Sequence, residues 1–393
     1  MAQPSTLRAT VGVLAALSLV AGCGGGGAGK NTSSIFGRSP TGQAQPTAGG
    51  NPTPTPTPTP APTPGATPAP TPNPLGKLYA VDFRANAIRV FDDPAAKGGA
   101  PGTQATDIAP DRVISGAATG LSEPLNADID PRLDELYVTN RGASPDEVLV
   151  FSSASTANGN VGPARRIGLT GDNIRLSIAI DWVRDILYVV RTDNQIGVYE
   201  RASTINGPAT PARTFSFPLT TIAIVRIAVD PLADRLFVPT ALNNSVIIVD
   251  QASARTGATA VFQPPYREIK GTATGLGNPQ GLSFDFQRDE MYVTCRDASP
   301  TSGIFVWTGL GAVTGNVAPA RRMTGTATGF ATPIEGVIHR ERDCLYQLND
   351  SATAIRIFAG AMTLNGAVAP ARLISGSRTG FSFINDLVLD PTR

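Results

Sequence analysis

The sequence predicts an all-β fold: a six-bladed β-propeller closed by the C-terminal strand and preceded by a signal peptide and a disordered Pro/Thr-rich linker. Three observations predict it. A short strand signature recurs at steps of 49 to 58 residues, each repeat holds four strand-like segments, and no amphipathic helical segment separates the repeats. Four short antiparallel strands in a repeat of about 50 residues are typical of a propeller blade, which buries its faces against its neighbours.

The first element, residues 1–22, is a predicted lipoprotein signal peptide. Arg8 precedes a short apolar segment at residues 9–21, which is long enough for secretion but not for a membrane span. The Val-Ala-Gly-Cys segment that ends at Cys23 resembles the lipobox of bacterial lipoproteins. The resemblance implies cleavage before Cys23 and acylation of its thiol, for example with palmitate. Gly24, and not an aspartate, follows the cysteine, which resembles Gram-negative lipoproteins that are sorted to the outer membrane by default. An ordinary signal peptide with a chance cysteine is the alternative.

The second element is a lipid-anchored linker at residues 23–75, rich in Gly, Pro and Thr. Twelve prolines lie between Pro46 and Pro74. Such a segment cannot donate backbone hydrogen bonds regularly or bury a core, so we expect polyproline II. At about 3.1 Å per residue, residues 51–74 span on the order of 70 Å. The linker therefore suits a stalk that holds the following domain away from a membrane.

The third element, residues 76–393, is the repeat region. Its Leu-Tyr-Val signature occurs at Leu78-Tyr79, Leu136-Tyr137, Leu187-Tyr188, Leu236-Phe237, Met291-Tyr292 and Leu345-Tyr346. Before most copies, an apolar strand ends in a turn with two aspartates four residues apart, as at Asp130 and Asp134. Aspartate oxygens in a tight turn accept local N–H groups, so we expect these acids to be structural and not catalytic.

The fourth segment of a repeat begins with Pro-Ala-Arg and leads into a Gly-x-x-Thr-Gly connection. The first motif starts at Pro163, Pro211, Pro319 and Pro370, and the second at Gly116, Gly271, Gly325 and Gly376. Proline at the start of a strand is tolerated on a sheet edge, which is where the outermost strand of a blade lies.

Closure of the ring follows from the strand count. The strand at residues 77–82 has no inner strand before it, and residues 384–391 supply one at the other end of the chain. Six blades without free edges result. The repeated motifs resemble bacterial NHL-repeat and SMP-30-like six-bladed propellers over residues 76–393. That architecture hosts many functions, so the resemblance predicts the fold better than the chemistry.

A candidate site lies on the inner strands, where side chains alternate between two faces. The position four residues before the turn aspartate holds Asn126, Ser177, Arg226, Gly281, Glu335 and Asp386. With Asp128, which lies two residues along, this set gives the candidate channel or ligand site: Asn126, Asp128, Arg226, Glu335 and Asp386. We expect these side chains to converge near the face opposite the turns.

SMP-30-like hydrolases hold a divalent cation in the channel with Glu, Asp and Asn side chains. The resemblance implies Glu335, Asp386 and Asn126 as metal ligands, for an ion such as Ca2+. The alternative is a solvated, salt-bridged funnel in which Arg226 pairs with Glu335 or Asp386.

Three further residues carry predictions. His339, the single histidine, takes the place of a turn aspartate and is expected to be structural, at the end opposite the ligand site. Cys295 ends one second strand and Cys344 begins the next, which puts their Cα atoms beyond the reach of a disulfide. We expect two buried free thiols.

Composition limits the function. The net charge is +1 without a Lys/Arg cluster, which gives no footprint for nucleic acid, and no apolar run after the N-terminus is long enough to span a membrane. We favour a lipoprotein of the bacterial cell envelope, in the outer membrane and facing the periplasm or the cell surface. Its propeller would bind or scaffold a protein or carbohydrate ligand through the face opposite the turns, with no cofactor. The alternative is an SMP-30-like metal-dependent lactonase or esterase, whose catalytic residues the sequence does not identify.

Overall fold

The structure, a computed structural model, describes residues 75–393 except 144, 171–173, 192, 219–223, 298–301 and 351–352, and it describes no side chains at 174–176. The predicted signal peptide, Cys23 and the linker up to residue 74 lie outside the described residues. Within the described part of the chain, no helix is both long and apolar enough to cross a membrane.

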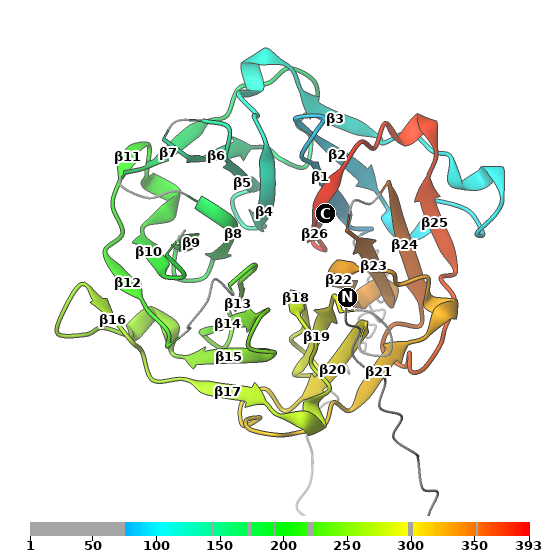
Figure 1. Cartoon of the computed structure of the whole chain (residues 1–393). Helices are drawn as coiled ribbons and strands as arrows, with labels where there is room; N and C mark the ends of the chain where they lie inside the picture. The colour runs from blue at the N-terminus through cyan, green and yellow to red at the C-terminus, as the bar shows by residue number, and fades with distance from the viewer. Residues whose placement is uncertain are drawn as a thin grey trace, which may run out of the picture. The chain divides into compact units, whose positions relative to one another are not determined.

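The described strands form six sheets around a central channel (Figure 1), and in each sheet the strands are ordered from the channel outwards. Blade 1 comprises β26 (Ile384–Asp390), β1 (Lys77–Asp82), β2 (Ala87–Asp92) and β3 (Arg112–Ser115). Blade 2 comprises β4 (Pro124–Asp130), β5 (Glu135–Asn140), β6 (Glu147–Ser152), β7 (Arg165–Leu169) and β11 (Gly207–Ala209). Blade 3 comprises β8 (Ile174–Asp181), β9 (Ile186–Arg191), β10 (Ile196–Glu200), β12 (Arg213–Phe215) and β16 (Val261–Phe262).

Blade 4 comprises β13 (Ala228–Asp230), β14 (Arg235–Thr240), β15 (Ser245–Asp250) and β17 (Arg267–Lys270). Blade 5 comprises β18 (Pro279–Asp285), β19 (Glu290–Cys295), β20 (Gly303–Thr308) and β21 (Arg321–Thr324). Blade 6 comprises β22 (Pro333–His339), β23 (Cys344–Asn349), β24 (Ala354–Ala359) and β25 (Arg372–Ser375). The predicted all-β, six-bladed propeller is confirmed.

Short 3-10 helices make up the helical structure of the described residues. They are Pro94–Ala96, Gln104–Thr106, Ala117–Thr119, Ala202–Thr204, Ala252–Ala254, Thr272–Thr274, Thr326–Thr328, Arg340–Arg342 and Ser377–Thr379.

The C-terminal strand closes the ring as the strand count predicts. β26 pairs antiparallel with β1, so that Leu389 lies opposite Leu78 and Leu387 opposite Ala80. The inner strand of the first blade thus comes from the other end of the chain, and the two ends of the domain are held in one sheet.

The hydrophobic core lies between neighbouring blades and explains the Leu-Tyr-Val signature. Tyr79 and Val81 of β1 pack in one fully buried cluster with Leu136 and Val138 of β5 in the next blade. Tyr137, on the other face of β5, packs in the following cluster. Each second strand is buried on both faces, so both alternating sets of side chains must be apolar.

Turns between the first and second strands of each blade lie at one end of the ring, which we call the turn face. Asp130 accepts the backbone N–H groups of Arg132 (2.9 Å) and Leu133 (3.2 Å), and the same pair of contacts recurs in the next three blades. Asp134 adopts the left-handed conformation (φ 56°) and accepts the N–H of Ser155 (2.9 Å). The aspartates of these turns are structural, as predicted.

Outer strands are less exposed than the sequence suggests. β11, which follows the third strand of blade 3, pairs in parallel with β7 of blade 2, and β16 pairs in the same way with β12. The loop of one blade therefore covers the edge of the blade before it, and Pro163 and Pro211 do not precede free edge strands.

His339 and the two cysteines are buried. His339 pairs with Cys344 across the turn of blade 6 and is fully enclosed, and burial lowers the pKa of its imidazole. Gly76 lies against the imidazole ring of His339, because a Cβ at Gly76 would come within 2.5 Å of Cε1 of that ring. Cys295 and Cys344 are free and buried, so the prediction of two unpaired thiols is confirmed.

Candidate functional site

The polar side chains predicted on the inner strands meet in the channel. We call Asn126, Ser177, Arg226, Glu335 and Asp386 the polar ring. At this level the pairing of the inner strands shifts register in β4, β8, β18 and β22. A bulge of this kind re-aims side chains and releases backbone N–H groups from the ladder. Both effects place polar groups at the centre of the molecule.

Arg226 holds the two acids of the ring together. Its Nε lies 2.6 Å from Oε2 of Glu335, and its Nη2 lies 3.6 Å from Oδ1 of Asp386. The guanidinium also donates to the carbonyl of Asn385. The predicted pairing of Arg226 is therefore present, but the expected solvated funnel is wrong, because Arg226, Glu335 and Asp386 are only 6%, 5% and 2% exposed.

Other members of the ring bind the released N–H groups of the next blade. Asp386 accepts the backbone N–H of Ala127 (2.9 Å) and the side-chain amide of Asn126 (2.8 Å). Asn126 in turn accepts the N–H of Ile178 (2.8 Å). Ser177 accepts the N–H of Ile227 (3.2 Å) in the same way, so a ring side chain of blades 1, 2 and 3 satisfies an inner-strand donor of the next blade, as buried backbone groups require.

Gly281 is the sixth residue at this level, and its lack of a side chain is needed. A Cβ at Gly281 would lie 2.7 Å from both Oε1 of Glu335 and the carbonyl oxygen of Ile334. The Glu335 carboxyl therefore occupies the space that a side chain in blade 5 would otherwise fill.

The ring does not fit a divalent cation in this arrangement. Arg226 occupies the position between Glu335 and Asp386 that a cation would take, and Asn126 is committed to Asp386 and Ile178. In the described part of the chain, no group of three or more His, Cys, Asp and Glu side chains is arranged to hold a metal ion. Metal binding by Glu335, Asp386 and Asn126 stays a prediction without a geometric basis.

Burial acts on the acids of the ring. It raises the pKa of Glu335 and of Asp386, and the adjacent Arg226 opposes the shift in both. Hydrogen bonds from the N–H of Ala127 and from Asn126 also favour the ionised form of Asp386.

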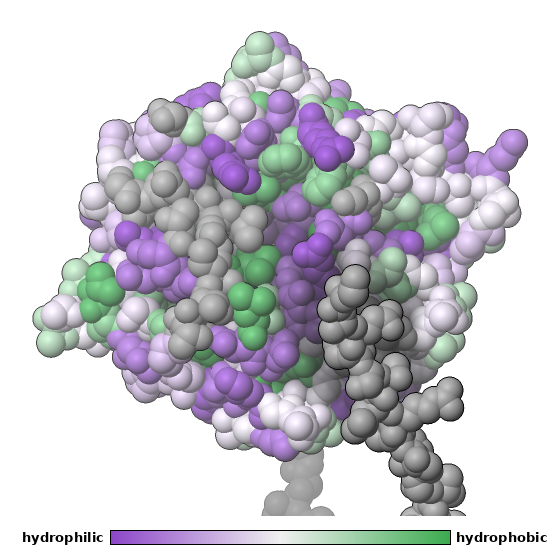
Figure 2. Space-filling view, in the orientation of Figure 1, coloured by the Kyte–Doolittle hydropathy of each residue, from purple (hydrophilic) through white to green (hydrophobic). Residues whose placement is uncertain are grey.

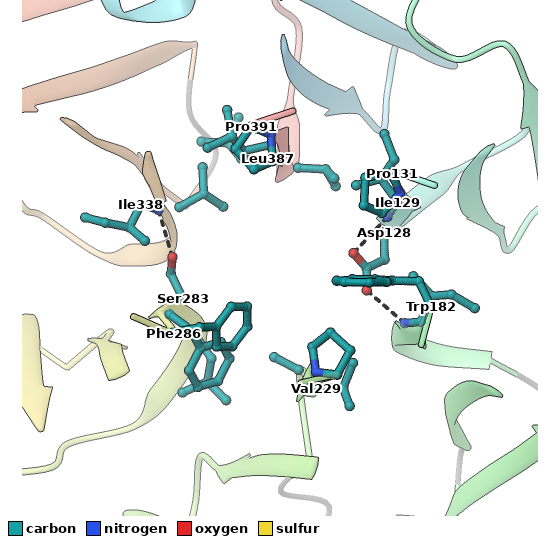
Figure 3. Close-up of a pocket in the computed structure, with 18 of the residues that line it drawn as sticks. Asp128, Ile129, Pro131, Trp182, Val229, Ser283, Phe286, Ile338, Leu387 and Pro391 are labelled. Carbon is teal, nitrogen blue, oxygen red and sulfur yellow. Dashed lines mark hydrogen bonds between the residues drawn. The ribbon is translucent and has the colours of Figure 1, made fainter. Parts of the chain in front are cut away.

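A cavity of about 410 Å3 extends from the polar ring to the turn face. All five predicted site residues, Asn126, Asp128, Arg226, Glu335 and Asp386, line it. Colours run counterclockwise from blue to red in Figure 1 and clockwise in Figure 3, so the close-up looks into the cavity from the opposite face. Figure 2 shows hydrophilic residues around the centre of the face in Figure 1, whereas the side chains in Figure 3 are largely apolar.

The position of this cavity corrects one expectation. The sequence placed the ligand site at the face opposite the turns, but the cavity reaches the turn residues Pro131, Pro231 and Pro391. The physical reason is that the polar ring is buried by its own pairing and fills the channel at that level. His339 accordingly lies at the same end as the cavity and not at the opposite one.

Asp128 lies on the wall of the cavity, across from Ser283 (Figure 3). Its Oδ1 accepts the N–H of Ile129 (2.8 Å) and its Oδ2 accepts the N–H of Ile180 in blade 3 (2.8 Å). Burial raises the pKa of Asp128 to about 7, although these two hydrogen bonds act in the other direction. Asp128 therefore changes charge near neutral pH.

Two aromatic residues at the mouth, Trp182 and Phe286, were missed by the sequence reasoning. Each follows a turn aspartate directly, at the position where three other turns have proline. Phe286 is 39% exposed and stacks on Phe284, with ring centres 5.5 Å apart. A large aromatic residue in place of a turn proline was the available signal.

Comparisons with known proteins support the fold. No protein-family model matches the chain, and no curated protein matches it. Among solved structures, a chain in the crystal structure of a nidogen/laminin complex is similar, with a TM-score of 0.53 and 12% sequence identity over 80% of this chain and 97% of that chain. At that identity the likeness shows a common fold alone, and the resemblance to NHL-repeat and SMP-30-like proteins stays a prediction.

Proposed function

We propose that this chain is a lipoprotein of the bacterial cell envelope whose propeller is a non-enzymatic binding module, with the ligand held in the cavity at the turn face. The cavity is the observation that carries the proposal. Its volume of about 410 Å3 and its mainly aliphatic, proline and aromatic walls suit a small ligand.

The mouth of the cavity favours an apolar ligand over a carbohydrate. Leu232 is 64% exposed and Phe286 is 39% exposed, and both line the cavity. Exposed apolar groups around a hollow mark interaction sites. Removing this surface from water would contribute about 25 cal/mol per Å2 to binding.

Binding is favoured over catalysis because the acids of the cavity are mostly committed. Glu335 and Asp386 pair with Arg226, whereas Asp285 lies 3.2 Å and Glu341 3.5 Å from nitrogens of Arg340. A lactonase or esterase of the SMP-30-like class would need carboxylates free to hold a cation that activates water. Stabilisation of the domain by Ca2+, Mn2+ or Zn2+ in a thermal melt would favour that enzyme instead.

Anchoring rests on the lipobox resemblance around Cys23. We expect Cys23→Ser to move the protein from the membrane fraction to the soluble fraction and to abolish labelling by a palmitate analogue. Protease treatment of intact cells then distinguishes the cell surface from the periplasm. Membrane association that survives Cys23→Ser would contradict the anchor.

Filling the cavity tests the ligand site. Ala228 lines it and is half-buried, so Ala228→Phe puts a ring into the cavity. We expect this change to reduce binding of the neutral apolar dye Nile red at least tenfold. Ala118→Phe is the matched control, because Ala118 is exposed and outside the cavity. Equal dye binding by the two variants would overturn the proposed site.

A further inference from the structure

We propose that the cavity binds an apolar molecule bearing one protonated amine, with the ammonium at Asp128 and the apolar body against the aliphatic and aromatic walls. This inference rests on the proposed function, because it assigns the ligand class of the same cavity. Four observations carry it: the charge of the lining, the remaining hydrogen-bond acceptor capacity of Asp128, the comparison with blade 5 and the aromatic rings.

The charge of the lining selects for a cation. Five carboxyl groups and two guanidinium groups line the cavity, which gives a formal net charge of −3 when all are ionised. In surroundings of low dielectric constant, such an imbalance disfavours an anion and favours a cation.

Asp128 differs from the other four acids of the cavity. Each of those has a guanidinium nitrogen within 4 Å, whereas the ion pairs of the described residues include none for Asp128. Each oxygen of Asp128 accepts one backbone N–H and keeps further acceptor capacity. The carboxylate can therefore accept hydrogen bonds from an ammonium group, and such charge-assisted bonds are the stronger kind.

Blade 5 shows that the fold does not need a charge at this position. Ser283 is the equivalent of Asp128, and its neutral hydroxyl accepts the N–H of Ile338 in the next blade (2.7 Å). The other four equivalents are apolar, namely Ala179, Ala228, Val337 and Val388. A carboxyl at Asp128 is thus more than the contact between blades requires.

Aromatic rings near Asp128 add to the preference for a cation. In Figure 3, Trp182 lies beside Asp128 on one wall, and Phe286 lies across the cavity with Ser283. The guanidinium of Arg132 lies 5.6 Å from the centre of the Trp182 ring, so this ring already attracts one cation. An ammonium group near a desolvated aromatic ring is favoured for the same reason.

A matched series of ligands tests the inference on the full-length chain carrying Cys23→Ser, so that no acyl group competes for the cavity. The probes are octylamine, 1-octanol and octanoate at pH 8, measured by calorimetry and by the change in tryptophan emission, to which Trp182 and Trp307 both contribute. We expect octylamine to bind at least tenfold more tightly than either other probe.

Variants separate charge from shape. Asp128→Asn should reduce octylamine affinity at least tenfold and leave 1-octanol within threefold. Asp128→Ser, which copies blade 5, should do the same and serves if the first variant folds poorly. Glu123→Gln is the control, because it removes one negative charge at an exposed residue outside the cavity and should change no affinity.

Every outcome decides something. Equal affinity for octylamine and 1-octanol would overturn the amine preference and leave the apolar binding site intact. Preference for octanoate would also overturn it. Failure of all three probes to bind would contradict both this inference and the proposed use of the cavity.

Discussion

At the outer side of the ring the same contact recurs from blade to blade, whereas around the channel each blade contributes a different side chain. The arginine that begins the outer strand donates to a carbonyl of the next blade in successive copies. The donor and acceptor pairs are Arg165 and Ala202, Arg213 and Ser253, Arg267 and Leu310, Arg321 and Ala361, and Arg372 and Ala95.

The channel shows no such repetition. Its polar ring consists of an amide, a hydroxyl, a guanidinium and two carboxyl groups, with a glycine in the remaining blade. Repetition marks the residues that every blade needs in order to pack, and departure from the repeat marks residues that are free to differ. Asp128, Trp182 and Phe286 belong to the second kind, because each differs from the residue at the equivalent position of most other blades.

The largest expected effect comes from removing the strand that closes the ring. A chain ending at Phe381 lacks β26, which supplies the inner strand of blade 1 and also Asp386 of the polar ring. We expect loss of the cooperative thermal transition, because β1 is left with an open edge and Arg226 loses one partner. Circular dichroism and thermal melting measure this, and a stable folded product would contradict the closed ring.

The next effect concerns the channel alone. Arg226→Met leaves Glu335 and Asp386 buried without their cation, which should destabilise the domain by about 3–5 kcal/mol. Urea unfolding measures the change. Adding Glu335→Gln to Arg226→Met removes one uncompensated charge and should restore part of the stability. If the double variant were less stable than Arg226→Met, the charge argument would fail.

Sequence reasoning reached the fold more completely than the site. The Asp130 turn, the Leu-Tyr-Val strand and the closing strand are local, repeated signals, and all were recovered. The members of the polar ring followed from the alternation along a strand. The level of the cavity did not follow, because it depends on how Arg226 and Glu335, 109 residues apart, pack across the channel. The sequence offered this ion pair as an alternative, but neither segment indicates that the pair is buried and fills the channel at that level.

A smaller effect is expected at the outer side. Arg165 contacts Glu135 (2.5 Å) and the carbonyls of Ala202 and Ile205, so Arg165→Ala should cost about 2 kcal/mol. The adjacent Arg166 has a side chain that is 45% exposed and an ion pair with Glu147, so Arg166→Ala should cost less than about 1 kcal/mol. Chemical denaturation of the two variants compares them. Equal losses would mean that the contact between blades contributes little.

The smallest expected effect is the pH dependence set by Asp128. Burial raises its pKa to about 7, so the folded state holds a proton that the unfolded state has already released. The associated stability is fully present below pH 4 and is lost as the pH rises through 7. Asp128→Asn cannot ionise, so its stability relative to the natural protein should increase by on the order of 1 kcal/mol from pH 6 to pH 8.

Other charged groups face the same region and are present in both proteins, so the comparison between the two removes their contribution. They are Asp130 on β4, Asp386 on β26, Glu335 on β22 and Arg226, which lies two residues before the start of β13. Thermal melting of both proteins at pH 6 and pH 8 is the measurement. A stability difference that is the same at both pH values would show that Asp128 does not change its protonation state between pH 6 and pH 8, and an amine in the cavity would then bind with the same affinity at both pH values.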